Sequence, residues 1–125
     1  PEIATSCGEI FIIMAQGKRG FVDKLDFVTS IGHVSGGDSR QKLGVKTKGP
    51  TRLITDLALF EPDPETKEMI VTAMHPGVTR EQIQDNTGWQ VHFAAKVAET
   101  SPPTAQELEV LRDIQARTAR AHAAA

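Results

Sequence analysis

The chain has 125 residues and a mass of 13.6 kDa, which suits one domain with a single hydrophobic core. Hydrophobic residues make up 39% and charged residues 24%, a composition that excludes a disordered chain. A net charge of −2, with five Phe, one Trp and no Tyr, argues against general nucleic-acid binding. The apolar run from Ile10 to Ala15 is too short to cross a bilayer, and the one cysteine, Cys7, fits a reducing compartment. We therefore expect a cytoplasmic protein with neither a nucleic-acid nor a membrane partner.

The first half of the chain predicts two strands and a long loop. Residues 9–15 form a continuous apolar run typical of a strand that is buried on both faces. After a glycine-containing break, the alternation of apolar and polar side chains over 21–30 predicts a strand at 24–30. Residues 32–50 contain five glycines and no periodicity, which predicts a long loop, and such loops in compact domains are usually functional or mobile.

A hairpin is predicted next. Residues 52–60 form a second strongly apolar strand, and 69–74 form another. The two prolines in 61–65 fix the backbone and remove hydrogen-bond donors, so the chain must turn there. Residues 52–74 therefore predict an antiparallel hairpin with a long connection.

The last third predicts two helices around one strand. Thr79 and Gln82 match a capping box that opens a helix over 80–87, and Gly88 stands where a helix end often needs a left-handed residue. Apolar residues alternate over 89–93, which predicts a short final strand. Thr104 and Glu107 match a second capping box, which opens a helix over 105–120. That helix carries a narrow apolar stripe formed by Leu108, Leu111 and Ile114.

Taken in order, these elements predict a mixed α/β domain with too few helices to cover its apolar strands. The missing cover is expected from a partner chain or from residues upstream of Pro1.

Few residues carry the patterns of known chemistry. The four histidines (His33, His75, His92 and His122) have no metal-ligand spacing and no cysteine pair beside them, so we expect no metal. His33 lies in a glycine-rich stretch after a predicted strand, where it either faces a ligand or is a solvated loop residue. His75 precedes a proline at a turn, so a structural role competes with a catalytic one. Asp56 interrupts an apolar strand, and it either positions a site or ties a neighbouring loop.

A basic segment follows the glycine-rich stretch. Over thirteen residues it holds five cations and no acid: Arg40, Lys42, Lys46, Lys48 and Arg52. Such a segment either meets phosphates or is a solvated basic loop. Its glycine spacing matches neither a P-loop nor a dinucleotide fingerprint.

Several strings together resemble one enzyme family. In chain order they are residues 21–30 with Gly32, then 52–60, then His75-Pro-Gly-Val-Thr79 and Asn86-Thr-Gly88. They are similar to the C-terminal half of β subunits of family I coenzyme A transferases of the glutaconate CoA-transferase type. The resemblance covers about residues 1–104, and residues 105–125 would then be a C-terminal helix and tail.

The resemblance implies an α/β fold of the NagB/RpiA/CoA-transferase type, with a mixed sheet and flanking helices. It implies two protein partners, an α-type subunit and the N-terminal half of the β subunit, with the active site between the subunits. Family enzymes move coenzyme A between an acyl-CoA and a carboxylic acid through a glutamyl-CoA thioester. The nucleophilic glutamate lies in the part of the β subunit upstream of this chain, so no catalytic residue is expected here.

For coenzyme A or substrate binding we expect Ser30, Gly32, His33, Lys46 and Lys48. Two alternatives remain open. Related hydrolases cleave a carbon–carbon bond of cyclic acyl-CoA intermediates, and a non-catalytic assembly domain would only complete a partner's sheet.

Overall fold

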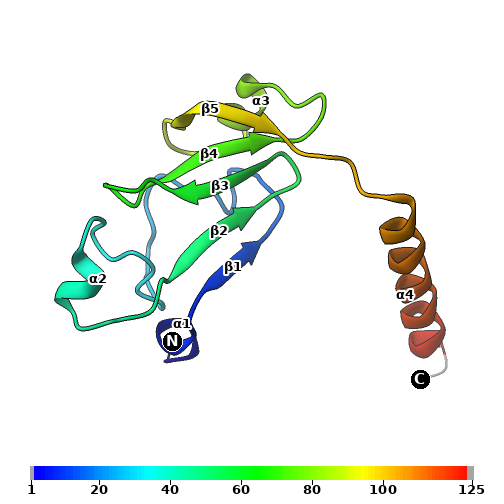
Figure 1. Ribbon diagram of the computed structural model, residues 1–125, viewed down its shortest axis with the longest axis horizontal. Coiled ribbons are helices and arrows are strands. Elements are labelled where there is room, and N and C mark those ends of the chain that lie inside the picture. Colours follow the sequence, from blue (N-terminus) through cyan, green and yellow to red (C-terminus); the bar gives the residue numbers. More distant parts are fainter. Residues whose placement is uncertain (1, 124–125) are drawn as a thin grey trace.

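A computed structural model describes residues 2–123 and shows a five-stranded mixed sheet (Figure 1). The strands follow the chain order across the sheet: β1 Ile10–Ile13, β2 Pro50–Ile54, β3 Ala58–Pro62, β4 Met69–Met74 and β5 Phe93–Glu99. The two outer pairs, β1–β2 and β4–β5, are parallel, and the inner pairs are antiparallel. The predicted mixed α/β architecture is therefore confirmed. Pro1 and residues 124–125, at the outer ends of the two predicted segments 1–104 and 105–125, lie outside the described residues.

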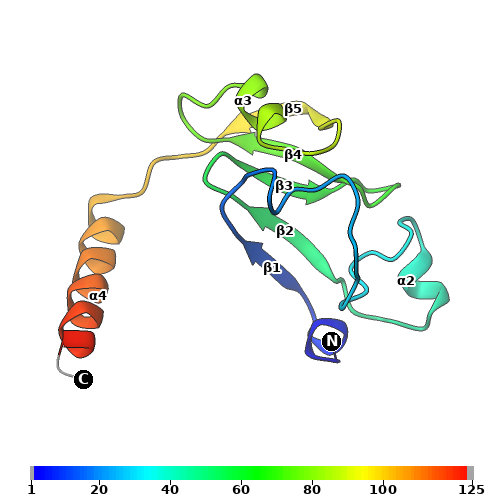
Figure 2. The ribbon, with the colours of Figure 1, turned by 180° about the vertical axis from the view of Figure 1, so that it is seen from behind.

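The described residues contain four helices: α1 Glu2–Ser6, α2 Ser39–Lys42, α3 Arg80–Asp85 and α4 Ala105–Ala123. α3 packs against the sheet through Ile83, which is fully buried. α4 stands apart from the sheet at the end of an extended segment, as both views show (Figures 1 and 2). Within residues 2–123 no helix is long and apolar enough to span a membrane.

The core lies on one face of the sheet. Its largest fully buried side chains are Phe60, Val71 and Ile83. Phe21 belongs to the same core, and its ring stacks on Trp89 with the ring centroids 5.7 Å apart. Phe21 belongs to the chain between β1 and α2, which runs across this face (Figure 2).

Gly88 is needed for close packing and not for a left-handed backbone, because its φ is not positive. A Cβ at Gly88 would lie 2.6 Å from the carbonyl oxygen of Phe21, which accepts a hydrogen bond from the Gly88 N–H. The predicted left-handed helix end is thus wrong, and a close approach of two backbones explains the glycine.

The predicted strand at 24–30 is wrong. This segment has no regular structure, and Leu25, Phe27 and Val28 are each more than half exposed. A segment with alternating apolar and polar residues forms a strand only if another strand pairs with its backbone. In the described chain no strand pairs with residues 24–30. Phe21 is buried in the core, and the residues that follow it lie on the surface.

The single strand predicted at 52–60 is two strands joined by a tight turn, so 52–74 belongs to a meander of three strands. Thr55 causes the break, because its hydroxyl oxygen accepts hydrogen bonds from the backbone N–H groups of Leu57 and Ala58. Its backbone N–H also donates to the carbonyl oxygen of Ala58 at 2.9 Å, which closes the turn between β2 and β3.

The predictions based on local signals are closer to the structure. Strands are present within 9–15 and at 69–74, and both capping boxes form, at Thr79 with Gln82 and at Thr104 with Glu107. The short strand predicted at 89–93 begins only at Phe93 and continues to Glu99. The predicted long loop at 32–50 contains the short helix α2, which the glycine-rich sequence did not predict.

The face of the sheet opposite the core is largely open at β1. Ile12 pairs with the core residue Leu53, so Phe11 and Ile13 point to the other face. Their side chains are 56% and 77% exposed. This open face agrees with the expectation that the chain has too few helices to cover its apolar strands.

Candidate anion-binding site

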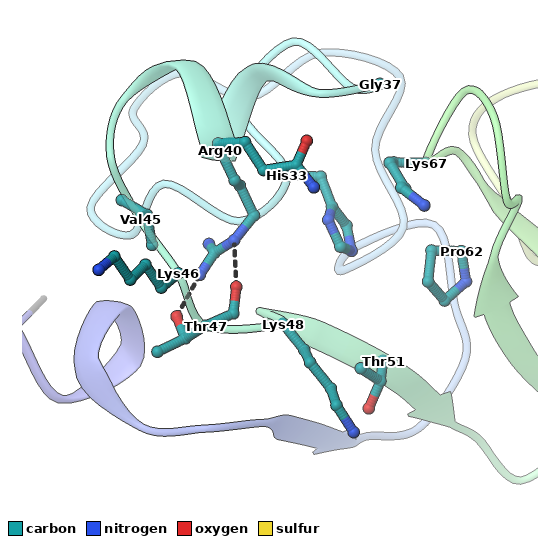
Figure 3. A pocket seen from close by; sticks show the side chains of 11 residues that line it. His33, Gly37, Arg40, Val45, Lys46, Thr47, Lys48, Thr51, Pro62 and Lys67 are labelled. Atoms are coloured by element: carbon teal, nitrogen blue, oxygen red, sulfur yellow. Dashed lines mark hydrogen bonds between the residues drawn. The ribbon is translucent and has the colours of Figure 1, made fainter.

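A cavity of about 330 Å³ lies between the loop that carries α2 and the start of β2 (Figure 3). Eleven residues line it: His33, Gly37, Arg40, Gln41, Val45, Lys46, Thr47, Lys48, Thr51, Pro62 and Lys67. Five of them are basic or can become basic, and none is acidic. The cavity therefore offers a cationic environment.

Arg40 is the buried anchor of this site, with only 7% of its surface exposed. Its guanidinium donates to the carbonyl oxygen of Gly32 at 2.6 Å, to the carbonyl oxygen of Thr47 at 3.2 Å and to the Thr47 hydroxyl at 2.6 Å. The Thr47 hydroxyl in turn donates to the carbonyl oxygen of Thr5. Because one rigid fork makes all three bonds, Arg40 holds the two ends of the glycine-rich loop together.

Gly49 makes room for this anchor. A Cβ there would lie 2.9 Å from the guanidinium carbon of Arg40, and its φ of +75° is one that side chains rarely adopt.

The turn between β3 and β4 brings Lys67 to the same cavity. The carboxylate of Asp63 accepts hydrogen bonds from the backbone N–H groups of Thr66 and Glu65, which lower the pKa of Asp63 below its ordinary value. Gly37 joins the loop to this turn, since its N–H donates to the carbonyl oxygen of Thr66 at 3.0 Å. At Gly36 a Cβ would lie 2.2 Å from the same oxygen, so only glycine fits.

Three of the five predicted site residues line the cavity: His33, Lys46 and Lys48. The Nε2 of His33 donates to the carbonyl oxygen of Pro50 at 2.6 Å, which fixes that nitrogen as the protonated one. Lys46 and Lys48 are exposed, and Lys48 lies 3.9 Å from the carboxylate of Glu9. Figure 3 shows that Lys46, Lys48 and Lys67 come from two parts of the chain and that their ammonium groups point in different directions.

Ser30 and Gly32 do not line the cavity. Ser30 is exposed outside it, and Gly32 contributes only the carbonyl oxygen that Arg40 binds. Of the remaining cations in the basic segment, Lys42 pairs with Asp38 at 2.8 Å and Arg52 pairs with Glu61. The sequence missed Lys67 because it reaches the cavity from the next hairpin, with no pattern linking it to the loop.

His75 and Asp56 have structural partners. The Nε2 of His75 donates to the carbonyl oxygen of Thr55 at 2.9 Å, and its Nδ1 lies 2.7 Å from the Thr100 hydroxyl. Asp56 is exposed in the β2–β3 turn, not buried in a strand, and it accepts a hydrogen bond from the backbone N–H of Gln16 at 2.7 Å. It thereby ties the end of β1 to this turn.

The chemistry that this arrangement supports is binding. Lysine and arginine side chains around a cavity without acids favour anions, and phosphate groups above all. Two lining hydroxyls have fixed partners: Thr47 donates to the carbonyl oxygen of Thr5, and Thr51 donates to the carboxylate of Glu9 at 2.8 Å.

Comparison with known proteins identifies the family. The coenzyme A transferase family matches residues 1–86, and the chain belongs to this family. It is 57% identical over 122 residues to the B subunit of 3-oxoadipate CoA-transferase from Pseudomonas knackmussii, a match that covers 98% of this chain and 47% of that protein.

A solved structure and a hydrolase subunit are also similar. The crystal structure of glutaconate coenzyme A-transferase from Acidaminococcus fermentans matches with a TM-score of 0.76 and 32% identity over 88% of this chain and 42% of that chain. The cholesterol ring-cleaving hydrolase IpdB subunit of Rhodococcus jostii is 27% identical over 77% of this chain and 37% of that protein. The chain thus spans less than half the length of each of these relatives.

Proposed function

We propose that this chain is part of the β-type subunit of a CoA-transferase, an enzyme that moves coenzyme A between carboxylic acids. The observation that carries the proposal is the 57% identity to the B subunit of a 3-oxoadipate CoA-transferase over nearly the whole chain. The reaction passes through a glutamyl-CoA thioester, whose glutamate lies outside this chain. The rest of the β subunit and an α-type subunit complete the active site.

The basic cavity is proposed to bind the phosphates of coenzyme A, which here is a substrate and not a resident cofactor. The proposal is supported by the lining of the cavity, which includes Lys46, Lys48 and Lys67 from two segments of the chain and no acidic residue. His33 also lines the cavity, and the hydrogen bonds of Arg40 hold the loop in position.

The acyl group is proposed to be that of a dicarboxylic acid. 3-Oxoadipate and glutaconate, the acids in the names of the two transferase relatives, both carry two carboxylates. A reducing compartment, the cytoplasm, fits the single cysteine of the chain.

The binding proposal is tested by titrating coenzyme A into the purified assembly that contains this chain. We expect Lys46→Ala with Lys48→Ala to weaken binding, and to do so more at low salt, where charges are screened least. Lys42→Ala is the matched control, because Lys42 is an exposed lysine of the same loop that pairs with Asp38 outside the cavity. An unchanged affinity of the double variant at low ionic strength would instead support a solvated loop.

The transferase and the hydrolase differ in their need for an acceptor. With acyl-CoA and no free carboxylic acid, a transferase should release little coenzyme A, whereas a carbon–carbon hydrolase consumes its cyclic substrate with water alone. A scaffold should show no dependence on acyl-CoA in either assay. The hydrolase relative has the lower identity, 27%, and the transferase is therefore preferred.

A further inference from the structure

The C-terminal helix α4 is fully formed and buries none of its side chains. Its N-terminus is capped, because the hydroxyl of Thr104 accepts from the Glu107 N–H and the Glu107 carboxylate accepts from the Thr104 N–H. Val110, Leu111 and Ile114 are nevertheless 52%, 50% and 50% exposed. An amphipathic helix usually derives its stability from packing this face, so α4 lacks a partner in the described chain.

The apolar residues lie on one face. Gln106, Glu107, Val110, Leu111 and Ile114 line a shallow groove along the helix. At helical spacing the same face continues through Thr118 and Ala121, so that Leu111, Ile114, Thr118 and Ala121 follow the alternating three- and four-residue steps of a coiled-coil seam.

The connection holds this face away from the helix's own sheet. Ser101-Pro102-Pro103 precedes α4, and consecutive prolines favour an extended and semi-rigid backbone. Figures 1 and 2 both show α4 separated from the strands by this segment. Within the described residues the apolar face of the helix therefore meets no other element.

The charge distribution along α4 selects the partner. Three of the four charged residues in its first half are acidic: Glu107, Glu109 and Asp113, against Arg112. In the second half Arg117 and Arg120 are the charged residues, with His122 beyond them. A second α4 in the antiparallel direction would place the acidic half of each helix beside the basic half of the other. A parallel pair would instead set like charges against each other.

We propose that α4 is a dimerisation arm, which packs in the antiparallel direction against α4 of a second copy of this chain. The twofold axis passes between residues 112 and 113, so that Leu111 lies against Ile114 of the other copy. Glu107 then lies against Thr118 of the other copy and beside its Arg117. Such a contact is symmetric and closed. Because one helix pair is a small interface, it links copies within a larger assembly and is weak alone.

Cysteine cross-linking in the purified assembly tests this register. In a Cys7→Ser background, Glu107→Cys and Thr118→Cys variants with different affinity tags are co-expressed and oxidised. We expect a disulfide between the two tagged forms, and none between two Glu107→Cys copies. The Glu107 change keeps the backbone N–H that the Thr104 hydroxyl caps. Ala116→Cys is the matched control, because at helical spacing it lies on the opposite face.

Sedimentation of the same assembly gives an independent measurement. Ile114→Asp should halve the number of copies of this chain per assembly, or shift the association to at least tenfold higher concentration, and Ala116→Asp should do neither. A disulfide between two Glu107→Cys copies would overturn the antiparallel register. A disulfide to a different protein chain, or no cross-link together with an unchanged mass of the Ile114→Asp assembly, would overturn the proposal that the partner is a second copy.

Discussion

Arg40 shows how one buried side chain can shape the wall of a candidate binding site. It is 7% exposed, and each of its three hydrogen bonds ends on the loop that forms the cavity wall. A buried cation that keeps these partners is tolerated, but one that loses them leaves unpaired groups behind. The position of Lys46 and Lys48 therefore depends on the planar geometry of the guanidinium and not only on its charge.

We predict that Arg40→Lys weakens coenzyme A binding several-fold although the charge is kept, because a lysine cannot reach Gly32 and Thr47 together. Loss of buried hydrogen bonds should also lower the free energy of unfolding by about 1–3 kcal/mol. Coenzyme A titration and denaturant unfolding of the assembly measure the two effects. Arg19→Lys, an exposed arginine outside the cavity, should change neither. Wild-type affinity of Arg40→Lys would contradict the anchoring role.

Part of this site was predictable from the sequence, and the reason is local. A histidine in a glycine-rich stretch and two lysines a few residues later can be seen in the chain itself, and His33, Lys46 and Lys48 do meet at the cavity. The burial of Arg40 and the arrival of Lys67 depend on how separate loops pack. Charge alone could not distinguish Arg40 from Lys42, which forms a surface pair with Asp38.

At the scale of the element, α3 is defined by its capping box. The Thr79 hydroxyl accepts from the Gln82 N–H at 3.2 Å, and the Gln82 side chain accepts from the Thr79 N–H at 2.8 Å. We predict that Thr79→Ala lowers the free energy of unfolding of the assembly by about 0.5–2 kcal/mol, because backbone donors at the helix start lose their partner. Thr79→Ser, which keeps the hydroxyl, should remain near wild type. An equal stability of the alanine variant in denaturant unfolding would show that the cap contributes nothing.

The stability of the turn between β3 and β4 should depend on pH. Backbone N–H groups of Thr66 and Glu65 lower the pKa of Asp63 from its ordinary value of 3.8, so the ionised carboxylate stabilises the folded turn. This contribution is complete above the ordinary pKa and is lost as the pH falls through the lowered one. We predict that amide exchange at Glu65 and Thr66 accelerates at acidic pH, after correction for the intrinsic rate. In Asp63→Asn the acceleration should already be present at neutral pH, and equal protection in both proteins would contradict the role of the carboxylate.

Element predictions succeed where the signal is contained in a few adjacent residues. The capping boxes at Thr79 and Thr104 are such signals, and both form. The run 52–60 is apolar whether it forms one strand or two, and only the hydrogen bonds of Thr55 decide that it turns. The alternation at 24–30 has the same weakness, because a strand exists only when another strand pairs with it.

At the scale of the whole molecule, the chain belongs to an enzyme family, and its relatives named above are more than twice as long as this chain. Its 57% identical relative is matched over only 47% of that protein's length. The exposed side chains of Phe11 and Ile13 on the sheet, and of Leu25 and Phe27 on the adjacent segment, are apolar surface that a monomer rarely leaves in water. We infer that these surfaces are covered in the assembled enzyme.

The division of labour in that assembly gives the last prediction: this chain alone does not transfer coenzyme A. Covalent transfer requires a carboxylate aimed at the thioester carbon, with hydrogen-bond donors for the oxyanion. Three observations argue that no acid of the described chain fills this role. The backbone N–H of Thr104 lowers the pKa of Glu107 at a helix start, Asp63 closes a turn, and no acid lines the basic cavity.

The nucleophile should therefore come from a part of the enzyme outside these 125 residues, while this chain contributes its sheet and the loop that we propose binds phosphates. Incubation of the assembly with acyl-CoA, followed by borohydride reduction and peptide mapping, locates the thioester-bearing carboxylate. We expect the modified glutamate in a peptide that does not belong to this sequence, and no turnover by the chain in the absence of its partners. A reduced glutamate or aspartate within residues 1–125 would place the nucleophile here. Turnover by the isolated chain would equally contradict this division, because it would require a complete active site within one half of a subunit.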